Sequence, residues 1–226
     1  MNNSWHYSGG VSPTAQRLHA QYLRDQYAND LQNEMGDLSP HGFYAHLFFN
    51  GVYWGMYCIH ERPDDAFMAD YWGGEPEHYD SLKHNSNTVL AGSNADYNAM
   101  FSLASSAGEQ SVYEQVISQY LDLEPFINYM IMNFWMGNTD WAHQNWYAGR
   151  NRVEPGALFR YYSWDAEHTL ENTGDNVVGR NNSGGPTGLH QMLKAHPEYK
   201  MQFADRAHKL LVGVLREAGA GALLDE

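Results

Sequence analysis

The sequence predicts an α+β protein built as a single domain. Three observations support this fold class: two aromatic-rich β segments joined by Asn50-Gly51, an apolar run of helical length over residues 126–136, and two more short β segments directly after that run. A chain of 226 residues is long enough for one domain with a sizeable core. We expect residues 1–90 to form a strand-rich part and residues 91–226 a helical part.

The composition restricts the classes of function. Hydrophobic residues make up 43% of the chain and aromatic residues 14%, which is typical of a folded protein rather than a disordered one. There are 13 Lys and Arg against 27 Asp and Glu, so the formal net charge is −14. This charge argues against nucleic acid or an anionic membrane surface as partner. It suits a site that recruits divalent cations, or a basic protein partner.

Covalent and targeting features are few. The single cysteine, Cys58, excludes a disulfide within the chain, and we expect it to be a small core residue. No apolar run reaches the length of a membrane span. Residues 1–5 have neither the charged start nor the apolar core of a signal peptide.

The clearest local signal is a β-hairpin over residues 43–60. Asn50-Gly51 is the preferred pair for a type I′ turn, because both positions need a positive φ. Before it, the apolar spacing over residues 14–35 predicts a helix, which Gly36 ends. We expect the hairpin to form a layer above a mainly helical body, with the functional site in the cleft between them.

The segment between the hairpin and the apolar run contains shorter elements. Asp64 and its neighbours open a short helix towards Tyr71. The expected elements that follow are a strand at residues 79–83 and helices at residues 94–104 and 112–120.

The stretch from residue 121 to residue 167 organises the chain. A helix begins after Asp122, which can cap it, and Pro125 suits its first turn. Because residues 126–136 leave no polar face, this helix should be central, and Gly137 ends it.

A polar loop and a second β-hairpin follow the central helix. The hairpin strands are expected at residues 146–148 and 158–164. Residues 171–188 form a long loop, and such loops are functional or disordered. The remaining expectations are helices at residues 188–196 and 197–216, and a frayed tail at residues 219–222.

An acid, an amide and a second acid occur in this stretch as Asp140, Asn145 and Asp165. A phosphoryl-transfer site needs an acid for the proton of the acceptor hydroxyl, and an amide and a carboxylate that hold Mg²⁺ against the nucleotide phosphates. Protein kinases place the first acid and the amide on one loop and the metal acid after a β-hairpin. The order therefore indicates phosphoryl transfer, although D-x-x-x-x-N alone also suits an ordinary solvated loop.

Three motifs in this order resemble the CotH kinase family, the spore-coat-type atypical protein kinases. They are N-G-V-Y-W-G-M-Y with E-R-P after it, N-T-D-W with N-W-Y after it, and Y-S-W-D-A-E. The resemblance covers roughly residues 14–210. It implies a reduced protein-kinase-like fold that transfers phosphate from ATP to Ser or Thr of a protein, with Mg²⁺ or Mn²⁺ as the metal.

The resemblance also implies roles for single residues. Asp140 would be the catalytic acid, and Asn145 and Asp165 would be metal ligands. Glu167 stands where the family usually has a second Asp, and its carboxylate can still reach a metal or a lysine. Glu61 would be the partner of a nucleotide-binding lysine.

The position of that lysine departs from the family pattern. In kinases the phosphate-binding Lys lies on a strand before its Glu partner, whereas the first lysine here is Lys83, after Glu61. We therefore expect an N-terminally truncated or divergent family member. Either Lys83 supplies the positive charge from a different direction, or the nucleotide pocket is incomplete.

Two alternatives from other classes stay open. The first is a pseudokinase or coat-like interaction module, which the missing early lysine favours. The second is a His/Asp metallohydrolase with zinc or two metals, because four histidines lie near the acids in the motif order, although no H-E-x-x-H pair occurs. These histidines are His46, His60, His143 and His168.

Overall fold

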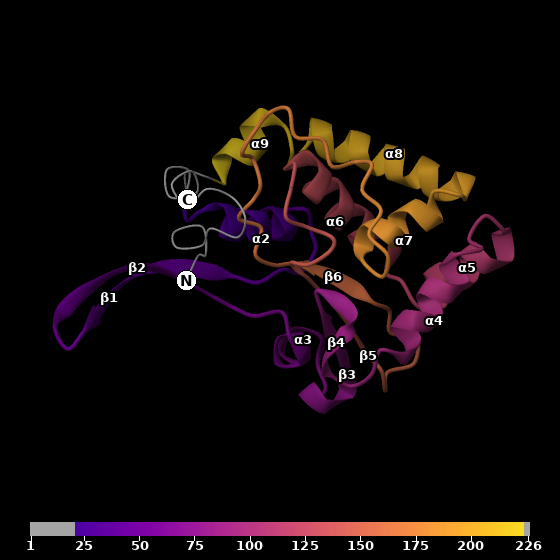
Figure 1. The fold of residues 1–226 in the computed structure, drawn as a ribbon, viewed down its shortest axis with the longest axis horizontal. Coiled ribbons are helices and arrows are strands. Elements are labelled where there is room, and N and C mark those ends of the chain that lie inside the picture. Colours follow the sequence, from indigo (N-terminus) through magenta and orange to yellow (C-terminus); the bar gives the residue numbers. More distant parts are fainter. Residues whose placement is uncertain (1–20, 224–226) are drawn as a thin grey trace.

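The computed structural model describes residues 21–223 and confirms the α+β class. It contains a two-stranded antiparallel sheet, β1-β2, and a four-stranded antiparallel sheet with the order β4-β3-β5-β6 (Figure 1). Residues 14–20 of the first expected helix lie outside the described residues. The likeness to a kinase fold and the division of the chain near residue 90 stay predictions.

The elements of the described chain agree with most of the expected ones. In chain order they are α2 (Arg24–Glu34), β1 (Gly42–Phe49), β2 (Val52–His60), α3 (Asp65–Trp72), the short 3-10 helix η2 (Pro76–His78), β3 (Tyr79–Lys83), β4 (Asn85–Ala91), α4 (Ala95–Ala104), α5 (Gln110–Gln119), α6 (Leu123–Trp135), β5 (Trp146–Asn151), β6 (Arg160–Ser163), α7 (Pro186–Leu193), α8 (Pro197–Val212) and α9 (Glu217–Ala222).

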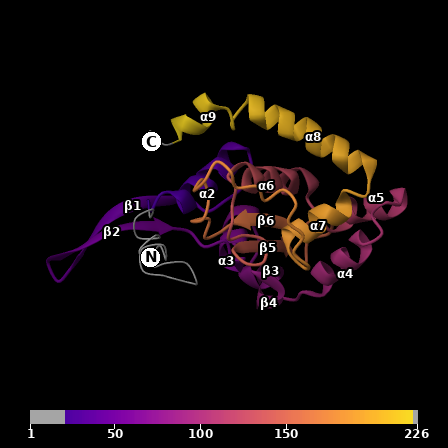
Figure 2. The ribbon, with the colours of Figure 1, turned by 45° about the horizontal axis from the view of Figure 1, so that its top comes forward.

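Helix α6 is central, as its apolar run predicted. All side chains of residues 126–133 are buried, and Figure 2 shows α6 between the four-stranded sheet and α8. Asp122 occupies the N-cap position without a capping bond, because its carboxylate accepts a hydrogen bond from Arg160 Nε at 2.7 Å. Although α6 is apolar, no helix among the described residues is long and apolar enough to cross a membrane.

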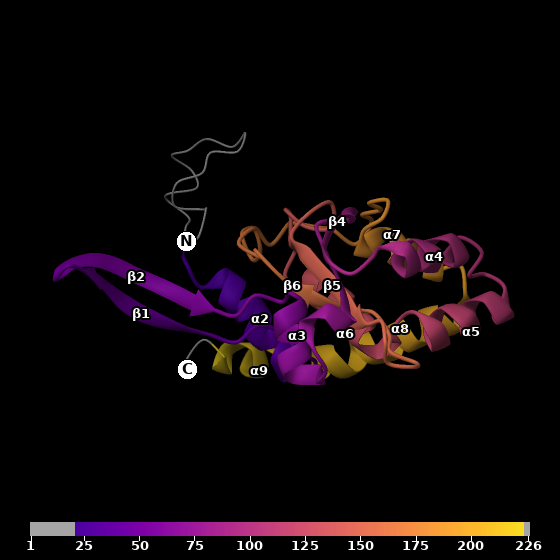
Figure 3. The same cartoon turned by 90° about the horizontal axis from the view of Figure 1, so that it is seen from below.

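The β1-β2 hairpin is confirmed, but it does not lie over the helical body. Asn50 and Gly51 have φ values of 49° and 81°, as a type I′ turn requires. At its base, the Tyr44 hydroxyl donates to the carbonyl of Tyr22 at 2.8 Å. The rest projects from the body (Figures 1 and 3), and Trp54 is 62% exposed. Aromatic residues on both strands predict pairing but do not specify what the faces pack against.

Three smaller features differ from the expectations. The sequence does not predict β4, whose pairing with β3 is irregular. Residues 219–222 were expected to fray, but they belong to α9, where Ala220 is buried and its carbonyl accepts a hydrogen bond from Tyr27 at 3.0 Å. Cys58 is half-buried rather than in the core, and its thiol lies against Gln26.

The register of the larger sheet gathers residues that are far apart in the sequence. Lys83 at the end of β3 pairs with Tyr147 near the start of β5, and Trp146 pairs with Ser163 at the end of β6. Three strand ends therefore meet at one edge of the sheet. Asn145 directly precedes β5 and Asp165 follows β6, so this edge carries both.

Candidate functional site

Asp140 lies on the loop between α6 and β5, and its carboxylate is held by side chains of the same loop. Its Oδ1 accepts a hydrogen bond from Gln144 Nε2 at 2.8 Å, and its Oδ2 accepts one from Asn145 Nδ2 at 3.2 Å. His143 Nε2 lies 3.4 Å from Oδ1. Because 34% of the Asp140 side chain is exposed, a second molecule can reach the carboxylate.

Asn145 connects the two acids. Its Nδ2 also donates to the backbone carbonyls of Asp140, at 3.0 Å, and Asp165, at 3.4 Å. Its backbone N–H donates to His84 Nδ1 at 2.9 Å, and this bond helps to hold a φ of 60°. No described residue donates a hydrogen bond to Oδ1 of Asn145. That oxygen is therefore available as a ligand.

Asp165 lies just after β6, in a segment that a half-buried acid of α2 supports. Asp25 accepts hydrogen bonds from the backbone N–H of Ala166, at 2.8 Å, and from that of Asp165. No described donor reaches the carboxylate of Asp165 itself. Burial, and then the charges of Asp25 and Asp140, raise the pKa of Asp165 to about 6. The Asp165 carboxylate is half-buried, has no described donor and is repelled by two other acids, and a bound cation would relieve this repulsion.

The backbone of the site is constrained. The N–H of Thr139 donates to the carbonyl of His168 at 2.9 Å, which ties the two acid-bearing loops together. Several non-glycine residues here have a positive φ, a conformation that costs about 1–3 kcal/mol each and clusters at functional sites. They are His84, Ala142, Asn145 and Asp165.

Two cations lie at the same sheet edge. The Nζ of Lys83 is 5.4 Å from the ring centroids of both Tyr147 and Trp164, and Arg62 Nε donates to the Tyr147 hydroxyl at 2.9 Å. Burial lowers the pKa of Lys83, Arg62 lowers it further, and Asp165 acts in the opposite direction. Neither cation forms an ion pair with a carboxylate of the described chain. The positive charge beside Asp165 is therefore available to an anionic ligand.

Glu61 has partners other than a lysine. Its carboxylate accepts hydrogen bonds from the backbone N–H of His41 and from the Tyr71 hydroxyl, both at 2.9 Å. These bonds lower the pKa of Glu61 although burial acts in the opposite direction. Within the described residues, the structure does not pair Glu61 with Lys83.

Glu167 is buried two residues beyond Asp165. Its backbone carbonyl accepts a hydrogen bond from Arg24 of α2 at 3.3 Å. Burial, and the charge of Glu167, raise the pKa of Tyr22 at the start of the described chain. Glu167 is therefore oriented in part towards the α2 side of the site.

The four histidines considered for a metallohydrolase do not gather at one place. His46 lies on the projecting hairpin and His60 stacks on Trp164, with ring centroids 5.4 Å apart. His143 and His168 lie beside acids of their own loops. In the part of the chain that is described, no group of three or more His, Cys, Asp or Glu side chains is arranged to hold a metal. Mg²⁺ sites need no such group, because waters and substrate phosphates complete the coordination of one or two carboxylates.

A cavity of about 280 Å³ lies elsewhere, at the turn of the β5-β6 hairpin. Arg150 and Arg160 line it, but Asp80 and Asp122 neutralise them. It contains none of the residues predicted for the site, and its cations are already paired.

Sequence reasoning did not identify several residues that shape this site. Arg62 lies within the E-R-P motif, and His84 directly follows Lys83, but neither position alone indicates a contact. Asp25 belongs to a helix expected only for packing. Arg180 donates to backbone carbonyls of the Asp140 loop. It belongs to the long loop over residues 171–188, for which the sequence indicates no particular residue.

Comparison with known families adds an independent finding. The family model described as CotH kinase protein matches residues 15–226, nearly the whole chain. This match confirms the resemblance that the three motifs indicate. No match to the chain was found among curated proteins.

Proposed function

We propose that this chain, which belongs to the CotH kinase family, is a metal-dependent protein kinase that transfers the γ-phosphoryl group of ATP to a Ser or Thr hydroxyl of a protein. Family membership supports a kinase-like function, and the nucleotide, metal and acceptor are parts of the proposal. The observation that carries it is the arrangement of Asp140, Asn145 and Asp165, because one amide contacts both acids.

The residues of the site fit a hard divalent cation. Asp165 and Oδ1 of Asn145 would hold Mg²⁺ or Mn²⁺, and Glu167 is a further carboxylate of the same segment. These are oxygen ligands, which such ions prefer. When bound, the ion would neutralise phosphate charge and fix the nucleotide.

Asp140 would accept the proton of the acceptor. In the proposed step, the hydroxyl proton moves to a carboxylate oxygen of Asp140 while the hydroxyl oxygen bonds to the γ-phosphorus. The bond from the γ-phosphorus to the β,γ-bridging oxygen breaks, and ADP leaves with that electron pair. Gln144 and Asn145 donate to Asp140 and hold its carboxylate in place.

Lys83 and Arg62 would bind the phosphates of the nucleotide. We expect Lys83→Gln and Arg62→Gln each to weaken the affinity for ATP by about 10- to 150-fold, because each removes a charge-assisted contact worth about 1.5–3 kcal/mol. Isothermal calorimetry with ATP and Mg²⁺ measures this. Lys200→Gln, at an exposed position of α8, is the matched control and should bind ATP normally. Unchanged affinity in both site variants would contradict the assignment.

The direct test uses γ-labelled ATP, Mg²⁺ and a basic, Ser-rich protein. We expect label on Ser or Thr of that protein or of the chain itself.

The pseudokinase or coat-like interaction module has one observation in its favour, since Glu61 is bonded to His41 and Tyr71 instead of a lysine. Nucleotide binding without turnover would support it. Zinc-dependent hydrolysis of other esters would instead support a metallohydrolase.

A further inference from the structure

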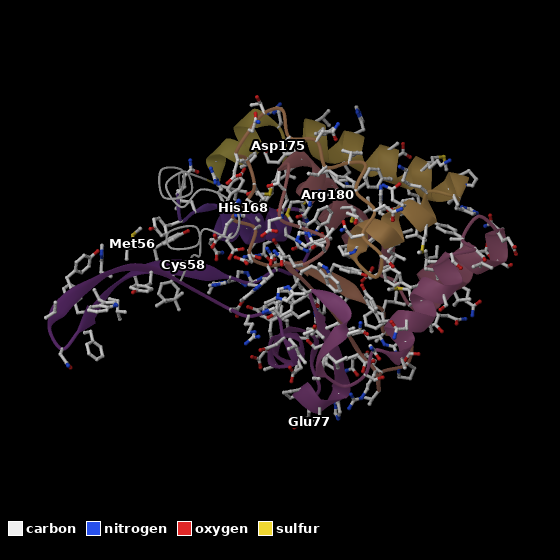
Figure 4. The ribbon with its side chains drawn as sticks, in the orientation of Figure 1. Met56, Cys58, Glu77, His168, Asp175 and Arg180 are labelled. Atoms are coloured by element: carbon white, nitrogen blue, oxygen red, sulfur yellow. The ribbon has the colours of Figure 1, made fainter. Side chains whose placement is uncertain are left out.

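The long loop after the metal motif contributes one side chain to the loop that carries Asp140. Arg180 Nη1 donates to the carbonyl of Trp141 at 2.7 Å, and Nη2 donates to the carbonyl of Thr139. Figure 4 labels Arg180 on the segment between β6 and α7. These two carbonyls belong to the residues on either side of Asp140. One guanidinium therefore holds the backbone on both sides of the acid.

Arg180 is itself fixed in place. Gln191 of α7 donates through Nε2 to the carbonyls of Arg180, at 3.1 Å, and Val178, at 3.3 Å. Further along the same loop, a Cβ added to Gly185 would lie 2.2 Å from the carbonyl oxygen of Ala142. This loop is therefore packed closely against the Asp140 loop and anchored to α7.

The chemistry of the Arg180 guanidinium suits the two carbonyls that it contacts. The guanidinium pairs with no described carboxylate, and it donates hydrogen bonds to the two carbonyls. A planar guanidinium offers donors in a fixed fork, whereas an ammonium is a point charge on a flexible stem. On the other side of the same peptide segment, the Trp141 indole donates to the Tyr129 hydroxyl at 2.7 Å.

We propose that Arg180 is a positioning residue that holds the backbone around Asp140 so that its carboxylate is aligned for the acceptor hydroxyl. This inference rests on the proposed function for the role of Asp140. The state of the long loop then determines the alignment of the acid, because Arg180 connects the two loops.

Kinetics should separate this role from binding. We expect Arg180→Gln to lower kcat about 10²-fold, since a misplacement of roughly 1 Å has such an effect. The Kd for ATP with Mg²⁺ should stay within about twofold, because Arg180 contacts backbone rather than ligand. Arg180→Lys should give an intermediate kcat, and it also serves as the better-folded variant should Arg180→Gln lower the melting midpoint. Lys200→Gln is the control.

A double-mutant cycle identifies the residue through which Arg180 acts. In an Asp140→Asn background, Arg180→Gln or Arg180→Lys should lower kcat little further. A full, multiplicative loss in that background would overturn the proposal.

Amide hydrogen exchange on the ligand-free protein tests the positioning without any activity. We expect faster exchange in residues 139–145 of Arg180→Gln and Arg180→Lys, with α6 and β5 unchanged. Unchanged exchange in that loop would overturn the inference even if the chain is an active kinase. Faster exchange in a chain without phosphotransfer would support the positioning and count against the proposed function alone.

Discussion

Asp165→Ala should abolish metal-dependent nucleotide binding. The carboxylate has no described donor and is repelled by the charges of Asp25 and Asp140, so a divalent cation is the partner that its environment lacks. Thermal shift with Mg²⁺ and ATP should show the ligand-induced increase in melting midpoint for the wild type and none for the variant. Asp205→Asn, at an exposed position of α8, is the matched control and should keep the full increase. An unchanged metal-dependent shift in Asp165→Ala would contradict the metal assignment.

The raised pKa of Asp165 gives this prediction a pH dependence. Its pKa in the folded state is about 6, so its charged form destabilises the metal-free fold above that pH, and this penalty disappears below the unfolded value near 4. Without metal, Asp165→Ala should therefore melt no lower than the wild type at pH 7.5.

Protons compete with the metal for the Asp165 carboxylate, so the wild-type affinity for Mg²⁺ with ATP should weaken about tenfold per pH unit below pH 6.

Asp140→Ala should lower turnover by about 10² to 10⁴, the usual contribution of a positioned general base. The affinity for ATP should hardly change, since Asp140 acts on the acceptor. The melting midpoint should also hardly change, because the partners of the carboxylate are Gln144 and Asn145 of the same loop, and the side chain is partly exposed.

A structural role for Asp140 makes a different prediction. If the loop depends on the hydrogen bonds that the Asp140 carboxylate accepts, Asp140→Ala leaves their donors without an acceptor. This would destabilise the fold by about 1 to 3 kcal/mol. Unfolding and phosphotransfer are therefore to be measured on the same variant. A large decrease in the melting midpoint, together with lost nucleotide binding, would show that Asp140 is structural and that its catalytic assignment is wrong.

The features that the sequence predicts are those with local signals. Asn50-Gly51 specifies the turn of the first hairpin, and the apolar run specifies α6. The course of the first hairpin away from the body and the helical state of α9 have no such signal. They depend on contacts between distant residues, such as the bond from Tyr27 to Ala220, 193 residues apart.

The same distinction holds for the site. Asp140 and Asn145 are five residues apart on one loop, so their spacing is visible in the sequence. The residues that hold the site come from far along the chain: the bond from Ala166 N–H to Asp25 spans 141 residues, and that from Asn145 N–H to His84 spans 61. Periodicity and motif spacing contain no information about such contacts, which arise only when α2 and the sheet edge meet.

The most direct measurement is mass-spectrometric mapping of phosphate on a basic, Ser-rich acceptor protein after incubation with ATP and Mg²⁺. Wild type and Asp140→Asn, purified in parallel, are compared so that a contaminating kinase would act equally in both. We expect phosphorylated Ser or Thr with the wild type, and a decrease of about 10² or more with the variant. Equal phosphorylation by both proteins, or none by either while ATP still binds, would contradict phosphoryl transfer at this site.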